Sequence, residues 1–472
     1  MFRRACALAL MALLSLTSAG AEEKEKPLPK DLPPYGAVKP FASPQVTERS
    51  LPNGLTLWLV PRRGFPKVAF AVAVRGGLAA DPQDRPGLSE LIVATLDQGT
   101  KTRSARQIAE EIQAAGGDLS GNARADSILI ATSVLSEKAD AALAVLADVL
   151  QNATFPASEV DLAKRNAADR LRSQEADPFF LTSRALMKAI FGPHPYSVIS
   201  PTQDSISQTT AAELRQEYAR RFRPDQAVMV AVGDFEPGKM EAQIRATLGN
   251  WAAPREAPVP AAGKPVQSAP HAAFLVARPG SVQTTLAVGS LGPTRGDPDF
   301  APAQVANAIY GGMFGSRLTR NIREDKGYTY TPFSYLNPRR HVAVFQTWAP
   351  VRNEVTGATL NEISYELNRM ATTSPSEEDV KQAELYLIGN RAIDLQAGDS
   401  VARELASLWV FGLPAEELGR ESEKIQKVTA QDVEAAGKKY FAAARQAVVA
   451  VGEEKVVKEE LAPFGIAINP AP

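Results

Sequence analysis

The sequence predicts an α+β protein built from two related halves, each with a sheet covered by helices. Three observations lead to this prediction. The chain has 472 residues, which is longer than a single core usually becomes. Apolar, strand-like runs alternate along it with amphipathic helical stretches. Two pairs of segments also match without gaps at nearly one offset, which indicates an internal duplication.

The repeated segments are a helix and a strand in each half. "TAAELRQEYARRFRPDQAVMVAVG", from Thr210, matches "TAQDVEAAGKKYFAAARQAVVAVG", from Thr429, at an offset of 219 residues. Nearer the start of each half, "ADPQDRPGLSELIVATLDQGT" matches "GDPDFAPAQVANAIYGGMFGS" at an offset of 216 residues. Any helix followed by a strand resembles another to some degree, but the shared offset favours duplication.

The remaining elements of the first half can be placed in order. "GLTLWLVP", "VAFAVAVRGG" and "DSILIATSVL" are apolar or alternating and predict strands. "SARQIAEEIQAAGG" predicts a helix with Ser104 as its N-cap and Gly116 as its stop. "KADAALAVLADVLQN" has apolar residues three and four apart and predicts a second helix.

The start of the chain predicts export. Residues 1–21 have the arginines, apolar run and small "AGA" cleavage site of a signal peptide, and a proline-rich extended lead-in follows at residues 22–45. Cleavage would remove Cys6, the only cysteine, so we expect no disulfide or thiolate site. No later segment reaches membrane-spanning length. The formal net charge of −1 argues against nucleic acid as a partner. The expected location is the periplasm.

Composition also divides the chain. Residues 250–271 are rich in proline and alanine and predict a linker between the halves. We therefore expect an N-terminal domain at 46–249, a C-terminal domain at 272–465 and a tail at 466–472.

Five stretches, taken together and in order, resemble one known family. They are "GGLAADPQDRPGLSELIVATLDQGT", "GGDLSGNARADSILIATSVL", "ADPFFLTSRALMKAIFGPHPYS", "FRPDQAVMVAVGDF" and "GSRLTRNIREDKGYTYTPFSYL". The chain resembles the pitrilysin-type zinc peptidases (inverzincins, the insulinase-like peptidase family M16). Within them it is most similar to the short bacterial branch related to mitochondrial processing peptidase. The resemblance implies the LuxS/MPP-like metallohydrolase fold, with two homologous domains that each contain a mainly antiparallel sheet. It also implies two such chains, or one doubled chain, closing around a chamber.

The zinc motif of that family is degenerate here. Active members carry H-x-x-E-H, in which two histidines on one helix face hold zinc and the glutamate acts on the attacking water. The three motif positions fall on Glu90, Val93 and Ala94. The family's third ligand, a glutamate in the helix before "DP", falls near Asp169 or Arg170. We therefore expect this chain to bind no metal, and we expect zinc on a partner subunit.

The three histidines do not replace the lost ligands. His194, His271 and His341 have no pair at the helical spacing of two zinc ligands. Each is expected to be a surface or structural residue.

The second half keeps a different part of the family's active centre. "GSRLTRNIREDKGYTY" resembles the segment that supplies an arginine and a tyrosine seven residues apart, and these fall on Arg323 and Tyr330. A helix ending at Gly327 and a strand over "YTYTPFSYL" would aim both residues at a common point. Arg323 could instead complement the end of its helix, and Tyr328 competes with Tyr330 for the assignment.

A glycine-rich stretch precedes this pair. "YGGMFGSR" contains Gly311, Gly312 and Gly315 and predicts either a flexible substrate loop or a plain turn between helices. It lacks the Gly-Lys-Ser/Thr ending of a phosphate loop.

These observations predict the non-zinc-binding subunit of a heteromeric metallopeptidase. Arg323 and Tyr330 would serve a zinc centre on a homologous partner chain, and an extended peptide would pair with a sheet edge near "LSGNARADSIL". We expect no activity from the chain alone. The alternative is a catalytically inactive scaffold or peptide-binding subunit of the same fold, in which Arg323 and Tyr330 are structural.

Overall fold

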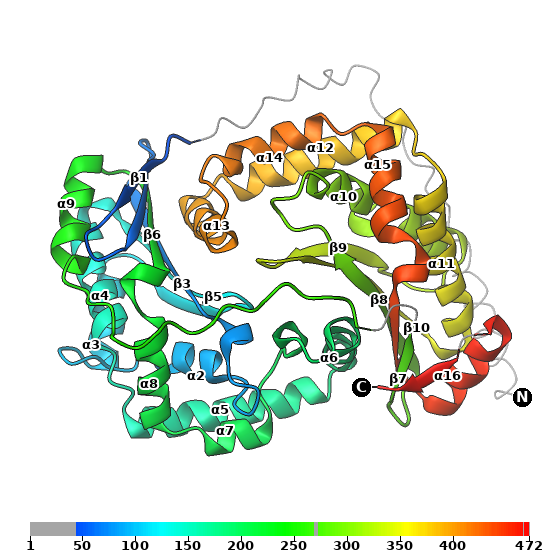
Figure 1. Cartoon of the computed structure of the whole chain (residues 1–472), viewed down its shortest axis with the longest axis horizontal. Helices are drawn as coiled ribbons and strands as arrows, with labels where there is room; N and C mark the ends of the chain where they lie inside the picture. Colours follow the sequence, from blue (N-terminus) through cyan, green and yellow to red (C-terminus); the bar gives the residue numbers. More distant parts are fainter. Residues whose placement is uncertain (1–43, 269–271, 466, 472) are drawn as a thin grey trace, which may run out of the picture. The chain divides into compact units, whose positions relative to one another are not determined.

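The fold consists of two six-stranded sheets with helices packed on them (Figure 1). The structure is a computed structural model that describes residues 44–268, 272–465 and 467–471. The expected signal peptide, almost all of the lead-in and His271 lie outside these residues. Within the described ranges, no helix has both the length and the apolar character needed to span a bilayer. The predicted α+β class is confirmed.

The first sheet and its helices come from residues 47–248. The strands are β1 (Thr47–Ser50), β2 (Thr56–Pro61), β3 (Lys67–Arg75), β4 (Leu119–Ala123), β5 (Ser127–Leu135) and β6 (Ala227–Gly233). The α-helices are α2 (Leu88–Thr95), α3 (Ala105–Ala114), α4 (Ala139–Asn152), α5 (Ala157–Glu175), α6 (Pro178–Phe191), α7 (Gln203–Gln208), α8 (Ala211–Arg221) and α9 (Pro237–Leu248).

The second sheet and its helices come from residues 273–470. The strands are β7 (Ala273–Ala277), β8 (Gln283–Gly292), β9 (Phe333–Pro338), β10 (Ala343–Arg352), β11 (Ala447–Gly452) and β12 (Ile468–Pro470). The α-helices are α10 (Phe300–Asn307), α11 (Thr356–Thr372), α12 (Glu377–Asp394), α13 (Gly398–Phe411), α14 (Glu417–Gln426), α15 (Ala430–Ala436) and α16 (Glu454–Leu461). Three π-helical segments are η5 (Ala308–Gly312), η6 (Thr319–Asp325) and η8 (Gly437–Phe441).

Five strands of each sheet repeat one topology, and the edge strands β1 and β12 differ, since β1 pairs antiparallel with β2 and β12 pairs in parallel with β7. The strand orders of the two sheets are β1-β2-β6-β3-β5-β4 and β12-β7-β11-β8-β10-β9. Strand β3 in the first sheet and strand β8 in the second pair antiparallel with both of their neighbours. Strand β2 pairs in parallel with β6, and β7 pairs in parallel with β11. The helix and strand of the first sequence repeat, α8 with β6, correspond to α15 and η8 with β11. The duplication seen in the sequence is therefore a duplication of topology.

Strand β3 shows why its sequence is apolar throughout. Its bulky residues at even positions, among them Phe70 and Val72, face the core made with helices of the first half. Its alanines at odd positions, Ala69, Ala71 and Ala73, face a second core that contains helix α13. A strand covered on both faces loses the alternation of apolar and polar residues. The small alanine side chains let the covering helix approach closely.

Each half supplies a helix to the other half's sheet. Helix α13 of the second half packs on β3, β5 and β6, and helix α6 of the first half packs on β8 and β11 (Figure 1). The second contact also has a small residue on the strand, Gly289 of β8. A side chain there would meet Ile190 and Leu186 of α6, so the glycine lets the helix pack closely on the sheet. The inner face of each sheet is therefore completed by a helix from the other half.

Three segments differ from the simple sequence picture. The strand expected to begin at Tyr328 begins at Phe333, and that prediction was wrong; Pro332 has no N–H to donate to a ladder, so the residues before it stay outside the sheet. Residues 468–470, placed in a tail, pair in parallel with β7. Residues 250–268 form no helix or strand and contact both halves, through Ser268 to Ile190 and Gln267 to Arg445.

Candidate functional site

Helix α2 carries Glu90, Val93 and Ala94, which the sequence resemblance assigns to a degenerate zinc motif. It starts directly after Gly87, whose φ of 95° lies in the left-handed region that glycine favours. The Asp81 carboxylate accepts the N–H groups of Gly87 and Ser89 at 3.0 and 3.2 Å and pairs with buried Arg221 at 3.0 Å. A carboxylate at the N-terminal end of a helix interacts favourably with the helix dipole, and its hydrogen bonds here fix where α2 begins. The orientation of Glu90, Val93 and Ala94 follows from that start.

Glu90 lies near Arg170 of helix α5. Burial raises the pKa of the half-buried Glu90 carboxyl, while the positive charge of Arg170 opposes the rise. Of the two residues expected near the third ligand position, Arg170 is thus the one whose charge acts on Glu90. Asp169 instead pairs with Arg172 on the exposed surface of α5. An arginine at a ligand position repels a divalent cation rather than binding it.

Val93 and Ala94 present only hydrocarbon. Val93 is half-buried, and a Cβ added to Gly121 of β4 would lie 2.7 Å from its Cγ1 atom, so helix and strand approach closely here. Ala94 is exposed and has no atom that can ligate a metal. Zinc takes nitrogen, sulfur or carboxylate oxygen ligands, usually four in number. The residues present at these positions therefore do not fit zinc.

The histidines of the described residues have other contacts. His194 accepts the N–H of Tyr196 through Nδ1 at 3.1 Å, and its Nε2 lies 3.0 Å from the carbonyl oxygen of Gly263. Burial and the charge of Arg340 lower the pKa of His341. Within the part of the chain that the structure describes, no three His, Cys, Asp or Glu side chains gather closely enough to hold a metal ion.

Arg323 and Tyr330 lie together in the second half. The guanidinium carbon of Arg323 is 4.5 Å from the centre of the Tyr330 ring, as in a cation–π contact. The same carbon is 4.8 Å from the centre of the Phe314 ring. The two aromatic side chains are 79 % and 69 % exposed, respectively. The guanidinium thus contacts two rings that are open to solvent.

The surrounding backbone holds this arrangement in place. Arg323 lies in η6, whose Ile322 is fully buried and whose Asn321 donates to Glu362 and Glu366 of α11 at 3.0 Å. Gly327, with φ of 63°, ends the helical segment as expected and donates its N–H to the Arg323 carbonyl. The Thr329 hydroxyl then donates to the Pro350 carbonyl of β10 at 2.5 Å. These contacts aim the chain at residue 330 back toward Arg323.

Tyr328 and the glycines have different surroundings. Tyr328 is partly buried and packs on the second core, so it is Tyr330 that faces the guanidinium. Gly311 and Gly312 lie in η5, where an added side chain would meet Leu318 or Asn307. They allow close packing at the end of a helical segment. Only Gly315 has open space around it, with its nearest neighbour 4.0 Å away.

Phe314 is the residue that reasoning from the sequence missed. It is a large aromatic residue placed between glycines, in "YGGMFGSR", and it proves to be mostly exposed. A large apolar side chain within a glycine-rich turn was the available signal, because such a turn offers little core for it to join.

Family models match most of the two halves. The model described as "Insulinase (Peptidase family M16)" matches residues 62–201, and the model described as "Peptidase M16 inactive domain" matches residues 208–386. The chain belongs to peptidase family M16. An uncharacterized zinc protease of Bacillus subtilis, YmxG, is 28 % identical over 287 residues, which cover 60 % of this chain and 68 % of the relative.

Solved structures of the M16 fold agree with this assignment. The crystal structure of a peptidase M16 inactive domain from Pseudomonas fluorescens aligns with a TM-score of 0.81 and 26 % identity, covering 86 % of this chain and 98 % of the other. A chain of complex III from Candida albicans aligns with a TM-score of 0.73 and 17 % identity, covering 88 % and 97 %. The second likeness concerns the fold alone.

Proposed function

We propose that this chain is the non-zinc-binding subunit of a two-chain M16 peptidase. In this proposal it supplies Arg323 and Tyr330 to substrate and transition-state binding at the zinc centre of a homologous partner chain. Membership of the family supports the peptidase context. The residues at the two histidine positions and the glutamate position of the motif, Glu90, Ala94 and Val93, support the division of labour, because together they offer one carboxylate and no further ligand or base.

One observation carries the proposal. Arg323 stacks on Tyr330 at 4.5 Å while the tyrosine ring remains 79 % exposed. A side chain of purely structural use is usually buried where it makes its contacts, whereas an exposed aromatic beside a cation marks a surface suited to binding. Hydrogen bonds from Gly327 to the Arg323 carbonyl and from Thr329 to the Pro350 carbonyl hold the backbone around the pair, so the pair is positioned before any ligand binds.

The chemistry of the two groups suits peptide hydrolysis. When water attacks a peptide carbonyl, negative charge grows on the oxygen, and a tyrosine hydroxyl can donate a hydrogen bond to it. The Arg323 guanidinium lies over two aromatic rings, and its five N–H donors remain able to bind a neighbouring substrate carbonyl. The tyrosine would stabilise the transition state and the arginine would fix the register of the peptide.

A sheet edge is available for the peptide backbone. Strand β4 lies at the edge of the first sheet and pairs only with β5 among the described strands. Its residues Gly121 and Asn122 are exposed. An extended peptide could add to this edge by backbone hydrogen bonds, the mode known as β-strand addition.

The test is a mixing experiment. A homologous chain that carries H-x-x-E-H, identified by co-purification, should give peptidase activity only when mixed with this chain. Arg323→Ala and Tyr330→Phe should each lower the mixed activity by roughly ten- to a thousand-fold, the scale of removing one transition-state donor. Tyr365→Phe, an exposed tyrosine on α11, is the matched control and should change little.

A scaffold or peptide-binding subunit is the second candidate. The two ring contacts of Arg323 would in that case only stabilise the local turn. Undiminished mixed activity for both variants, with normal assembly, would favour this candidate and would contradict the catalytic one. Stoichiometric zinc on the purified chain alone would contradict both.

The proposed location is the periplasm. The motivation is the signal-like composition of residues 1–21. Fractionation of cells that express a tagged full-length chain should place it outside the cytoplasm. Retention of the tagged chain in the cytoplasm, at the full-length mass, would rule the location out.

A further inference from the structure

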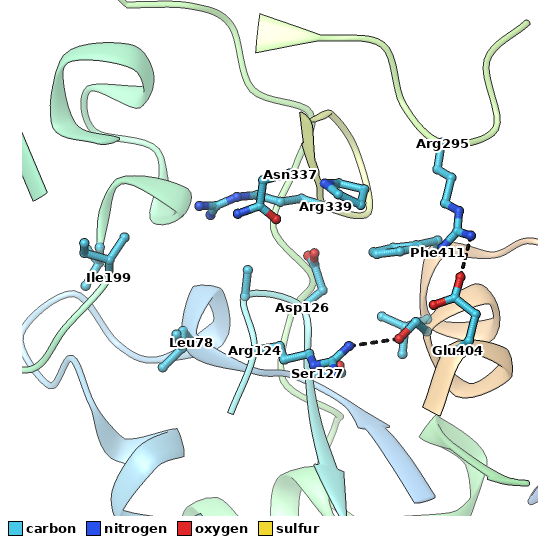
Figure 2. A pocket seen from close by; sticks show the side chains of 15 residues that line it. Leu78, Arg124, Asp126, Ser127, Ile199, Arg295, Asn337, Arg339, Glu404 and Phe411 are labelled. Atoms are coloured by element: carbon cyan, nitrogen blue, oxygen red, sulfur yellow. Dashed lines mark hydrogen bonds and ion pairs between the residues drawn. The ribbon is translucent and has the colours of Figure 1, made fainter. Parts of the chain in front are cut away.

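A cavity of about 400 Å³ lies where the two halves meet, and its lining includes no residue of helix α2 and neither Arg323 nor Tyr330. It is drawn in Figure 2. The β4–β5 turn contributes Arg124 and Asp126, the end of β9 contributes Asn337, the turn after β9 contributes Arg339, and α13 contributes Phe411. Ligand pockets of proteins commonly have this size and often occur between structural units.

The charges that line the cavity do not cancel. Three arginines, Arg124, Arg295 and Arg339, face two carboxylates, Asp126 and Glu404. Arg295 and Glu404 belong to a cluster of four charges with Arg391 and Glu421, in which each arginine pairs with both glutamates. The two positive and two negative charges of this cluster cancel, which leaves Arg124, Arg339 and Asp126 in the lining. One positive charge is therefore left over in the lining, and one monoanion would balance it.

Arg339 is the least satisfied of these groups. Its side chain is only 8 % exposed, and its Nε has no hydrogen-bond partner among the described residues. One terminal nitrogen donates to the Tyr196 carbonyl at 3.2 Å and the other lies 3.5 Å from Met187 Sδ, while the guanidinium carbon lies 5.1 and 4.8 Å from the centres of the Phe191 and Tyr196 rings. No described carboxylate lies within ion-pair distance of it; burial lowers its pKa, and the more distant charge of Asp126 opposes that change. A buried cation is costly when no anion pairs with it directly.

Arg124, the remaining arginine of the lining outside the four-charge cluster, is also available to bind an anion. Arg124 donates to the Ser407 hydroxyl at 2.9 Å and forms no ion pair with a described carboxylate. Asp126 is already occupied, because it accepts the Tyr196 hydroxyl at 2.5 Å and the Arg340 N–H at 2.9 Å. The cavity thus offers donors to an anion from both halves of the chain.

The rest of the wall is apolar. Leu78, Ile199, Val410 and Phe411 line the cavity beside these donors (Figure 2). Such a surface stabilises a hydrocarbon or aromatic group through burial. A ligand that suits both parts of the wall has one carboxylate and one apolar side chain.

We propose that this cavity binds the C-terminal residue of a peptide, with the free carboxylate at Arg124 and an apolar side chain against Phe411, which lies on the same side of the cavity (Figure 2). The cavity belongs to this chain alone, so the inference does not depend on a partner or on the Arg323–Tyr330 pair. It assigns the chain a second contact with peptides, one that recognises a chain end.

The test measures binding to the full-length chain by isothermal titration calorimetry. N-acetyl-phenylalanine is the probe, its amide lacks the charge, and N-acetylglycine lacks the apolar group. We expect the acid to bind roughly ten- to a hundred-fold more tightly than the amide, as expected for charge-assisted hydrogen bonds. N-acetylglycine should also bind more weakly than N-acetyl-phenylalanine, by about ten-fold or more.

Variants separate this site from general surface charge. Arg124→Gln should abolish the preference for the acid, and it is the primary variant because Arg339 also joins the halves through Phe191 and Tyr196. Arg106→Gln, on the exposed face of α3, removes an equal charge elsewhere and should leave the preference intact. Equal binding of acid and amide, an unchanged preference in Arg124→Gln, or no binding of the acid up to about 10 mM would each overturn the inference.

Discussion

Val93, at the position where the sequence resemblance expects a catalytic base, packs closely on Gly121. A valine at residue 93 turns this face of α2 into hydrocarbon, and the absence of a side chain at Gly121 leaves room for it against β4. Valine is stiff at χ1, so it cannot easily move away. The two residues therefore depend on each other, and restoring a glutamate at position 93 alone would place a charge against the strand.

Gly121→Ala should lower the free energy of unfolding by about 1–3 kcal/mol, the usual cost of overpacking. The reason is the distance of 2.7 Å between the added Cβ and Val93 Cγ1. Chemical denaturation measures the change. Gly389→Ala is the matched control: this glycine lies in helix α12 with nothing within 4 Å of the added carbon, so the variant should be neutral or more stable by up to about 1 kcal/mol. Equal stability of Gly121→Ala and the parent chain would contradict the close packing.

Glu90 predicts a pH dependence of stability. Burial raises the pKa of its carboxyl above the ordinary value of 4.5, although Arg170 opposes the rise. The folded state then binds more protons than the unfolded state in the window just above that value, so this carboxyl makes stability fall as pH rises through the window. Glu90→Gln removes the effect. The variant should gain stability relative to the parent chain as pH rises.

Urea unfolding of both chains at about pH 4 and about pH 7 measures this difference. Glu137→Gln, at an exposed glutamate, controls for the loss of a carboxyl as such. A difference between Glu90→Gln and the parent that stays constant with pH would show that Arg170 offsets the burial.

Among the elements, a capping signal predicted a helix start correctly, whereas an apolar pattern that contained a proline placed a strand start wrongly. Ser104 was expected to cap α3, and it does so in a capping box with Gln107, because both partners lie within one turn. The strand expected from Tyr328 fails at Pro332, where the apolar pattern says nothing of a missing donor. At the site, the spacing of Arg323 and Tyr330 was readable from the sequence. The contact of Phe314 with Arg323 was not, because it depends on how the glycine-rich turn folds back.

The face of β3 that packs on α13 supplies the prediction at this scale. Ala71→Leu should destabilise the chain by about 1–3 kcal/mol. Ala71 is fully buried beneath helix α13, so a larger side chain there would displace its neighbours. Thermal unfolding measures the loss. Ala109→Leu on the exposed face of α3 makes the same chemical change without a neighbour to displace and should cost little. A tolerated leucine at position 71 would mean that α13 is loosely held.

At the scale of the whole molecule, the sequence repeats predicted two like halves but not the exchange of helices between them. The continuous apolar run of β3 indicates cover on both faces. The amphipathic pattern of a helix shows that one face is buried, but it does not show which sheet covers that face. Helices α6 and α13 occupy corresponding places in the two halves, and each packs on the sheet of the other. Each half by itself would expose a large apolar face.

The two halves should therefore fold and unfold as one unit. A fragment of residues 44–250 alone lacks α13, which leaves the apolar residues of β3 and β6 on that face open to water. It should aggregate, or bind the dye ANS strongly, and lack a cooperative transition. A chain cut within the exposed residues 255–258 of the linker is the control, since it retains both helices; its pieces should elute together and unfold in one transition. A monomeric, cooperatively folded fragment that binds no dye would show that the exchange is dispensable, and the halves would then count as independent domains joined by a linker.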